Sequence, residues 1–107
     1  MKHGYVSEKL GSATRGMASG QGDARQRLLA AFHVFHTLSA EDFPKELQVE
    51  WKGIMESLTS KGPVYDSKDE PIIGSVENTM RNISLEAAEE IAKRVVNLYD
   101  EVKSSKP

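Results

Sequence analysis

The segment SAEDFPKELQVEWKGIMESLTSKGP, residues Ser39 to Pro63, carries the clearest structural pattern in the chain. Its apolar side chains recur every three or four residues, a spacing that places them on one face of an α-helix: Leu47, Trp51, Ile54, Met55 and Leu58. Pro44 is typical of a helix start, and Gly62 followed by a proline is typical of a helix end. The pattern predicts a helix over residues 44–61.

Trp51 is the only tryptophan in the chain and lies in the middle of this apolar stripe. Large aromatic side chains contribute much of the buried area in a small core. We therefore expect Trp51 to be buried against the second and last helices, near Phe32, Phe35 and Tyr99.

Four further segments share the same helical spacing of apolar residues, and they predict helices over residues 6–18, 24–38, 75–83 and 85–103. In the last of these the apolar stripe begins at Leu85 and continues to Val102. The turn between the second helix and the helix at 44–61 is short, which predicts an antiparallel hairpin of these two helices. Gly11 and Gly16 are expected to weaken the first helix, because glycine is a poor helix former.

Polar residues that favour helix N-termini stand at or next to the start of three of these segments. Ser7, Asp23 and Ser84 are the expected N-caps, since their side-chain oxygens can accept hydrogen bonds from the first free N–H groups. Gln26 stands three residues after Asp23, which is the spacing of a capping box.

The connection GPVYDSKDEPIIG, residues 62–74, is long for a linker between helices. Val64-Tyr65 and Ile72-Ile73 flank an acidic turn, so the segment is either one long loop or a small hairpin, which Pro71 would make irregular. We therefore predict an all-α protein, a compact bundle of about five helices, three long and two short. It forms a single helical domain over residues 1–107, frayed at 1–5 and 104–107.

Composition restricts the function classes. The 107 residues include no cysteine, which excludes disulfides and thiolate chemistry, and the net charge of −2 gives no general reason to expect nucleic acid binding. No apolar run resembles a signal peptide or a membrane span, so we expect a cytoplasmic protein without a membrane partner. Residues 1–39 are mildly basic and residues 40–70 acidic, a weak asymmetry.

The loop from Gly20 to Asp23 leads into a helix that begins with Arg25 and Arg27. A helix N-terminus with two guanidiniums can bind an anion. However, the loop lacks the Gly-Lys-Ser/Thr ending of a phosphate-binding loop, and Asp23 as an N-cap would occupy the N–H groups itself. We interpret the segment as a flexible turn followed by a cap.

Two other groups of residues contain side chains of the kinds that bind metal ions. His33 and His36 lie one helical turn apart, but no glutamate stands between them, so the zinc-protease motif is absent. The acids Asp66, Asp69 and Glu70 do not have the spacing of a calcium-binding EF-hand loop. We therefore predict no catalytic residue, no metal site and no cofactor.

The segments GQGDARQRLLAAF, DFPKELQVEW and IAKRVVNLY together resemble short uncharacterised helical proteins of proteobacteria and their mobile elements. The resemblance covers most of the chain, from about residue 10 to residue 99. It implies a compact all-α fold and a bacterial cytoplasmic setting, and it transfers no catalytic residue. Small proteins of mobile elements often act by binding a larger machine and blocking or redirecting it.

These observations favour a non-enzymatic protein–protein interaction module, an accessory or inhibitory factor of a larger bacterial complex. The alternative is a nucleic-acid-associated protein that uses its basic N-terminal face. The candidate partner-binding residues are Arg15, Arg25, Arg27, Tyr65 and Ile72. Of the two surfaces, we favour the arginines over the 62–74 loop, whose aliphatic residues could instead fold inward as a lid on the core. The sequence does not indicate an oligomeric state.

Overall fold

The computed structural model describes residues 3–105, apart from the side chains of Pro71 and Ile72. These residues form an all-α fold, as expected. The helices are α1 (Gly4–Ser19), α2 (Ala24–Phe35), α3 (Gln48–Leu58), α4 (Ser75–Asn82) and α5 (Leu85–Ser104). Two 3₁₀ turns, η1 (Ala40–Asp42) and η2 (Lys45–Leu47), precede α3. A small antiparallel ribbon of β1 (Val64–Tyr65) and β2 (Pro71–Ile73) separates α3 from α4.

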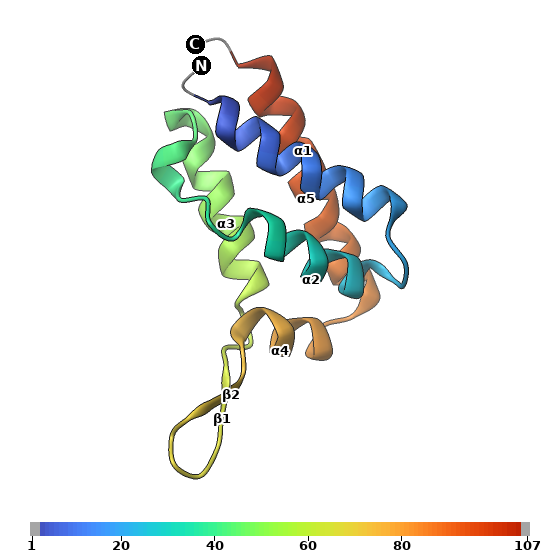
Figure 1. The fold of residues 1–107 in the computed structure, drawn as a ribbon, viewed down its shortest axis with the longest axis vertical. Coiled ribbons are helices and arrows are strands. Elements are labelled where there is room, and N and C mark those ends of the chain that lie inside the picture. Colours follow the sequence, from blue (N-terminus) through green and yellow to red (C-terminus); the bar gives the residue numbers. More distant parts are fainter. Residues whose placement is uncertain (1–2, 106–107) are drawn as a thin grey trace.

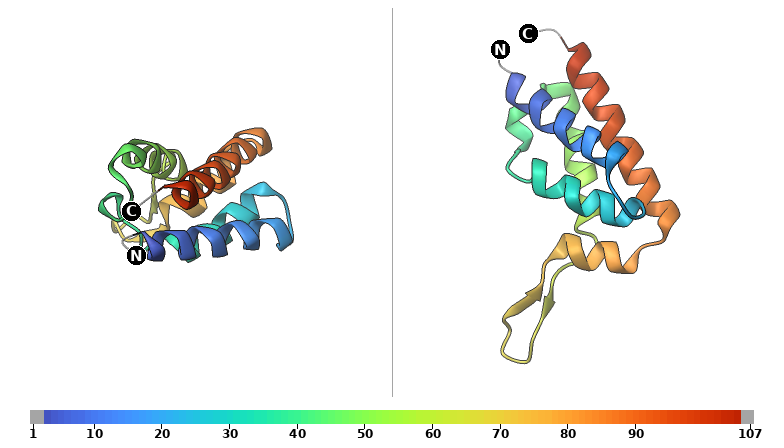
Figure 2. Two further views of the ribbon diagram at one scale, coloured as in Figure 1. Left: turned by 90° about the horizontal axis from the view of Figure 1, so that it is seen from above. Right: turned by 45° about the vertical axis from the view of Figure 1, so that its right-hand side comes forward.

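The helices pack in two layers, which are seen from above in Figure 2. One layer consists of α1 and α2, and the other of α3 and α5. The most extensive pairing is α1 with α2, and α5 contacts α1, α2 and α3. The expected hairpin of α2 and α3 is therefore wrong: α2 pairs along α1 instead. The residues between α2 and α3 form two 3₁₀ turns rather than one tight turn, so α3 can enter the second layer.

Trp51 is buried, as expected, with 3% of its surface exposed. Its ring meets Phe35 of α2 edge to face, with centroids 5.4 Å apart, and stacks on Phe43 at 4.7 Å. The expected neighbours were only partly correct. Phe32 forms its aromatic contacts with Phe35 and the two histidines rather than with Trp51. Phe43, which was not among the expected neighbours, stacks on Trp51. Phe43 reaches the core because η1 turns the chain back toward α3.

Two of the three expected N-caps are confirmed. The Asp23 carboxylate accepts hydrogen bonds from the backbone of Arg25 and Gln26, and Gln26 completes the capping box. The Ser84 hydroxyl accepts from the Ala87 N–H. Ser7 is not a cap, because α1 begins at Gly4 and its capping position is His3.

The helix bounds differ from expectation at several ends. The first helix begins two residues earlier than predicted, and the second ends at Phe35 rather than at residue 38. The helix predicted over 44–61 is an α-helix only from Gln48 to Leu58, because η2 forms its first turn. Beyond its end, Gly62 has a φ of +68°, the left-handed conformation that glycine adopts readily.

The ribbon of β1 and β2, with its connecting turn, forms an arm that points away from the bundle (Figure 1). We refer to residues 63–73 as the arm. α1 begins and α5 ends at the opposite end of the molecule, whose long axis extends 49 Å. None of the helices within residues 3–105 is both long enough and apolar enough to cross a membrane.

Candidate partner-binding surfaces

The residues that the sequence singled out for partner binding lie in separate places. Arg15 is exposed on α1, Arg25 and Arg27 stand in the first turn of α2, and Tyr65 lies on the arm. The side chain of Ile72 lies outside the described residues. The four described residues therefore do not converge on one site.

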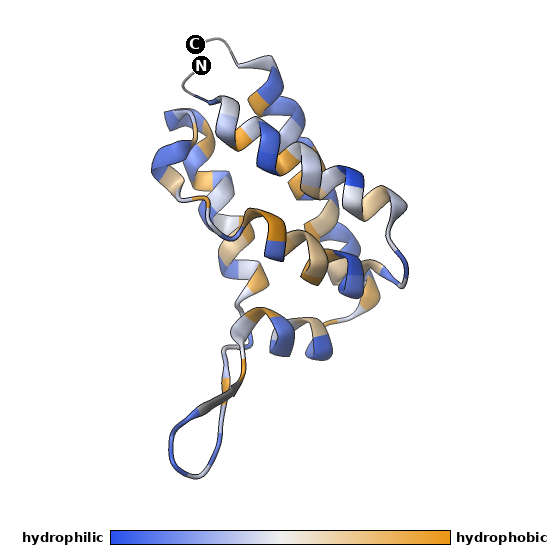
Figure 3. Ribbon diagram, viewed as in Figure 1, coloured by the Kyte–Doolittle hydropathy of each residue, from blue (hydrophilic) through white to orange (hydrophobic). Residues whose placement is uncertain are grey.

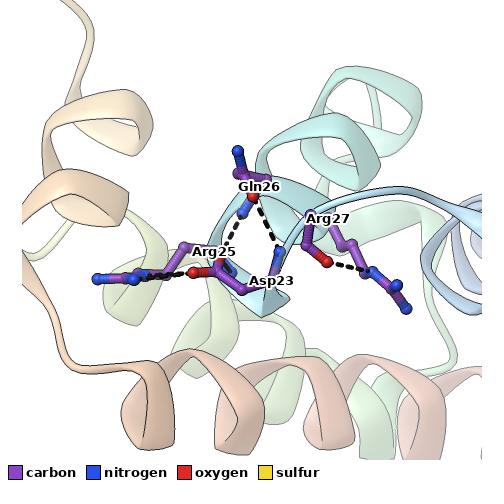
Figure 4. Close-up of polar contacts among 5 residues, drawn as sticks. Asp23, Arg25, Gln26 and Arg27 are labelled. Atoms are coloured by element: carbon purple, nitrogen blue, oxygen red, sulfur yellow. Dashed lines mark hydrogen bonds and ion pairs between the residues drawn. The ribbon is translucent and has the colours of Figure 1, made fainter.

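The side chain of Arg25 forms hydrogen bonds with Asp23, the N-cap residue of α2 (Figure 4). Its Nη2 lies 2.8 Å and its Nε 3.3 Å from Asp23 Oδ2, while Oδ1 of the same carboxylate accepts the backbone N–H groups of Arg25 and Gln26. The side-chain hydrogen bond from Arg25 lowers the pKa of Asp23 below its ordinary value, and Asp23 in turn raises the pKa of Arg25. The N-terminal N–H groups that an anion would need are thus occupied, as the capping interpretation predicted.

Arg27 forms a hydrogen bond with the end of the preceding helix, α1. Its Nη1 donates to the carbonyl of Met17, which is in the last turn of α1, and its Nε donates to the carbonyl of Gly22 in the connecting loop. Carbonyls in a last helical turn lack partners within their helix, so a cationic donor there stabilises the helix end. Sequence reasoning missed this role, because it links residues in two different helices.

The two histidines of α2 lie at the surface. Both His33 and His36 are exposed, and the ring of Phe32 lies about equally far from each, at 6.0 Å and 5.7 Å between centroids. Within residues 3–105, no group of three or more histidines and acids is arranged to hold a metal ion.

The tip of the arm is ordered by Asp66. Its Oδ1 accepts the backbone N–H groups of Lys68 at 2.8 Å and Glu70 at 2.9 Å, and its own N–H donates to the Glu70 carbonyl. Asp69 adopts a left-handed backbone with φ +60°, which short acidic and amide residues tolerate better than most. Below the tip, Val64 pairs with Ile73 and Tyr65 with Pro71, and the register shifts between them. Of the two alternatives for residues 62–74, one long loop or a small irregular hairpin, the structure shows the hairpin.

The base of the arm is fixed to α4. Thr79 is fully buried, and its hydroxyl accepts the backbone N–H of Lys61 while donating to the Ser75 carbonyl. The Asn78 side chain donates to the carbonyl of Gly62 at 3.0 Å. These bonds join the segment after α3 to α4 at the point where the arm leaves the bundle.

The arm does not cover the core. Val64 and Ile73 are half-buried, but neither belongs to the side chains packed against the core cluster, so the lid alternative is wrong for these two residues. Tyr65 is 55% exposed. Figure 3 shows the tip as hydrophilic, in contrast to the helices, along which apolar residues recur. The arm thus presents one aromatic ring below an acidic tip.

Comparison of the chain with protein-family models, with curated proteins and with solved structures found no match.

Proposed function

We propose that the chain is a non-enzymatic protein-binding module that docks its arm on a larger protein complex, as an accessory or inhibitory factor. The proposal depends on one observation, the arm itself. Two short strands project from the bundle, and within the described part of the chain no third strand pairs with them.

A projecting ribbon of this size is well suited to binding. A two-stranded hairpin alone is marginally stable in water, and its outer edges carry backbone groups that can pair with another strand. Tyr65 adds an exposed aromatic ring, the kind of side chain that is enriched at binding hot spots. The bonds from Thr79 and Asn78 fix the base of the arm, so less ordering is required when a partner binds.

The charge of the tip indicates the chemistry of the partner. Asp66, Asp69 and Glu70 outnumber the single cation, Lys68. We therefore infer a partner with a basic surface around an apolar contact for Tyr65, because opposite charges steer association and fix the orientation of a complex.

The arginine surface that the sequence favoured supports this function less well. Arg25 is paired with Asp23, and Arg27 is bonded to two main-chain carbonyls. The nucleic-acid alternative relied on the same side chains. The resemblance to short helical proteins of proteobacteria and their mobile elements is in line with a module that binds a larger machine.

The test is a comparative capture experiment. The tagged protein, a Tyr65→Ser/Glu70→Lys variant and a Val49→Ser control are each used to capture partners from a lysate of the source organism, followed by mass spectrometry. Val49 is 80% exposed on α3, so its variant removes an apolar surface residue away from the arm. We expect one protein to be captured by the wild type and the control and lost with the arm variant.

Circular dichroism should show that all three proteins are folded. Capture that is equal for the arm variant and the wild type would overturn the proposal. A gel shift with nucleic acid at two salt concentrations examines the alternative, because phosphate contacts make affinity fall steeply with salt. Salt-sensitive nucleic acid binding that the arm variant retains would favour the alternative.

A further inference from the structure

A groove lies between the α1–α2 connection and the first turns of α5, away from the arm. It has a volume of about 770 Å³. Both further views place the α1–α2 connection beside the start of α5 (Figure 2). One wall comes from Met17, Gly22 and Ala24, and the other from Leu85 and Ala92. Ala24 and Ala92 contribute only small side chains to this lining.

The apolar part of the groove lining is partly open to solvent. Leu85 is 42% exposed, although the sequence pattern placed it at the start of a core-facing stripe. It lies at the first position of α5, beyond the reach of the core, whereas Ala88 one turn later is fully buried. An exposed leucine beside a concave surface offers a contact for an apolar side chain of a ligand.

The rim of the groove is acidic. Asp23, Glu86, Glu89 and Glu90 line it, against the cations Arg27 and Lys93. Lys93 Nζ lies 3.6 Å from Glu90 Oε1, so these two charges form an ion pair. Arg25, which does not line the groove, forms an ion pair with Asp23. Glu86 and Glu89 form no ion pair within residues 3–105. The groove therefore combines apolar lining residues with carboxylates that are available to an incoming cation.

We propose that this groove binds a short basic segment of a partner protein, with one apolar side chain on Leu85 and flanking lysines or arginines on Glu86 and Glu89. Complementary charge favours such a segment over a neutral or acidic one. This docking surface is independent of the arm and does not require it.

Other occupants fit the groove less well. The arm tip of a second copy is acidic, so the glutamates of the rim would repel it. The groove is lined by the end of α1 and the start of α5, whereas α1 begins and α5 ends at the other ends of these two helices (Figure 1). The 16 residues of α1 span about 24 Å, and this length separates the start of α1 from the groove at its other end.

The test uses the full chain, labelled with ¹⁵N, and two capped peptides, KLKRLK and its acidic counterpart ELEELE. Amide shifts are followed by NMR during titration to about 1 mM peptide, the range of weak single-site binding. We expect KLKRLK to shift amides within residues 17–27 and 85–93, and ELEELE to leave them unchanged. Shifts confined to the arm tip, or no saturable shift with KLKRLK, would overturn the proposal.

Three variants localise the binding. Glu86→Lys/Glu89→Lys should weaken KLKRLK binding by at least about tenfold, since two attractive charges become repulsive. Leu85→Ser removes the apolar contact without changing charge and should also weaken it. Glu8→Lys/Glu101→Lys makes the same charge change at exposed positions away from the groove and should leave affinity within about threefold, because distant surface charges are screened.

An equal loss of affinity in both double variants would show only a general charge effect and would overturn the proposal. Self-association that depends on concentration and disappears in Glu86→Lys/Glu89→Lys would identify a second copy as the occupant, which also overturns it. The Tyr65→Ser/Glu70→Lys variant should bind KLKRLK as the wild type does, so failure of the arm proposal and failure of the groove proposal can be distinguished.

Discussion

The ring of Tyr99 on α5 lies directly against Gly11 on α1. A Cβ atom at position 11 would stand 2.9 Å from the tyrosine hydroxyl oxygen and 3.1 Å from two ring carbons. Gly11 is buried, so a side chain at this position would meet the Tyr99 ring, and one of the two would have to shift. Gly16 lies on the same helix with nothing within 4 Å of such an atom. The two glycines differ in role, although the sequence presents both as weak points of one helix.

Alanine substitution should separate these two roles. Gly16→Ala should raise the free energy of unfolding by up to about 1 kcal/mol, because alanine is the better helix former. Gly11→Ala should lower it by about 1–3 kcal/mol, because the new methyl group clashes with a rigid ring. Urea unfolding followed by circular dichroism measures both values. The Tyr99→Leu background should remove much of the penalty at position 11, and an equal gain from both alanines would contradict the close contact.

Trp51 should be the most costly single truncation among the aromatic core residues. Its ring contacts Phe35 and Phe43, and Trp51→Ala should lower the free energy of unfolding by about 3–5 kcal/mol. Val49→Ala on the same helix is the control and should change it by less than about 0.5 kcal/mol, because Val49 is exposed. A loss below about 1 kcal/mol for Trp51→Ala would show that the packing around the ring contributes little.

The cap of α2 should make stability depend on pH in the acid range. The pKa of Asp23 lies below its ordinary value of 3.8, chiefly because the Arg25 side chain donates to it. The folded state therefore binds the proton less readily than the unfolded state, so the carboxylate stabilises the fold above about pH 4, and this contribution is lost as pH falls through the lowered pKa.

Asp23→Asn tests the charge while keeping the cap, since asparagine also caps helices well. The decrease in stability between about pH 5 and about pH 2 should be smaller in Asp23→Asn than in the wild type. Arg25→Gln should reduce the decrease as well. Thermal melts across this range supply the comparison, and unchanged acid sensitivity in both variants would exclude the pair as its source.

Thr79 should control how firmly the base of the arm is held. Thr79→Val keeps the shape of the side chain but leaves the Lys61 N–H without its acceptor, which should lower the free energy of unfolding by about 1–3 kcal/mol. Hydrogen exchange at the Lys61 amide should become faster. Thr59→Val is the control, because the Thr59 hydroxyl is exposed and bonds only within its own helix. Unchanged exchange at Lys61 would rule out the anchoring role of Thr79.

The features that were predictable from the sequence are those that depend on neighbouring residues. The cap at Asp23 with Gln26, the cap at Ser84 and the irregular hairpin over 62–74 all follow from local hydrogen bonding and backbone preference. The helical stripe correctly predicted that Trp51 is buried, because a periodic apolar face must be covered.

The features that were not predictable depend on contacts between distant residues. Phe43 stacks on Trp51 because η1 reverses the chain, and no local pattern distinguishes that ring from an exposed one. The hydrogen bond from Arg27 to the end of α1 and the groove beside Leu85 were not predictable either. Both arise only when separate helices meet.

The placement of the chain ends has a practical consequence. α1 begins and α5 ends on the side opposite the arm, so anything fused to either end, such as a fluorescent protein or a surface anchor, departs from the far side of the bundle. An immobilised molecule would then present the arm outward, toward solution. Attachment through either terminus should therefore be interchangeable in assays of arm binding, and the same geometry would hold the arm clear of any neighbouring domain in a larger polypeptide.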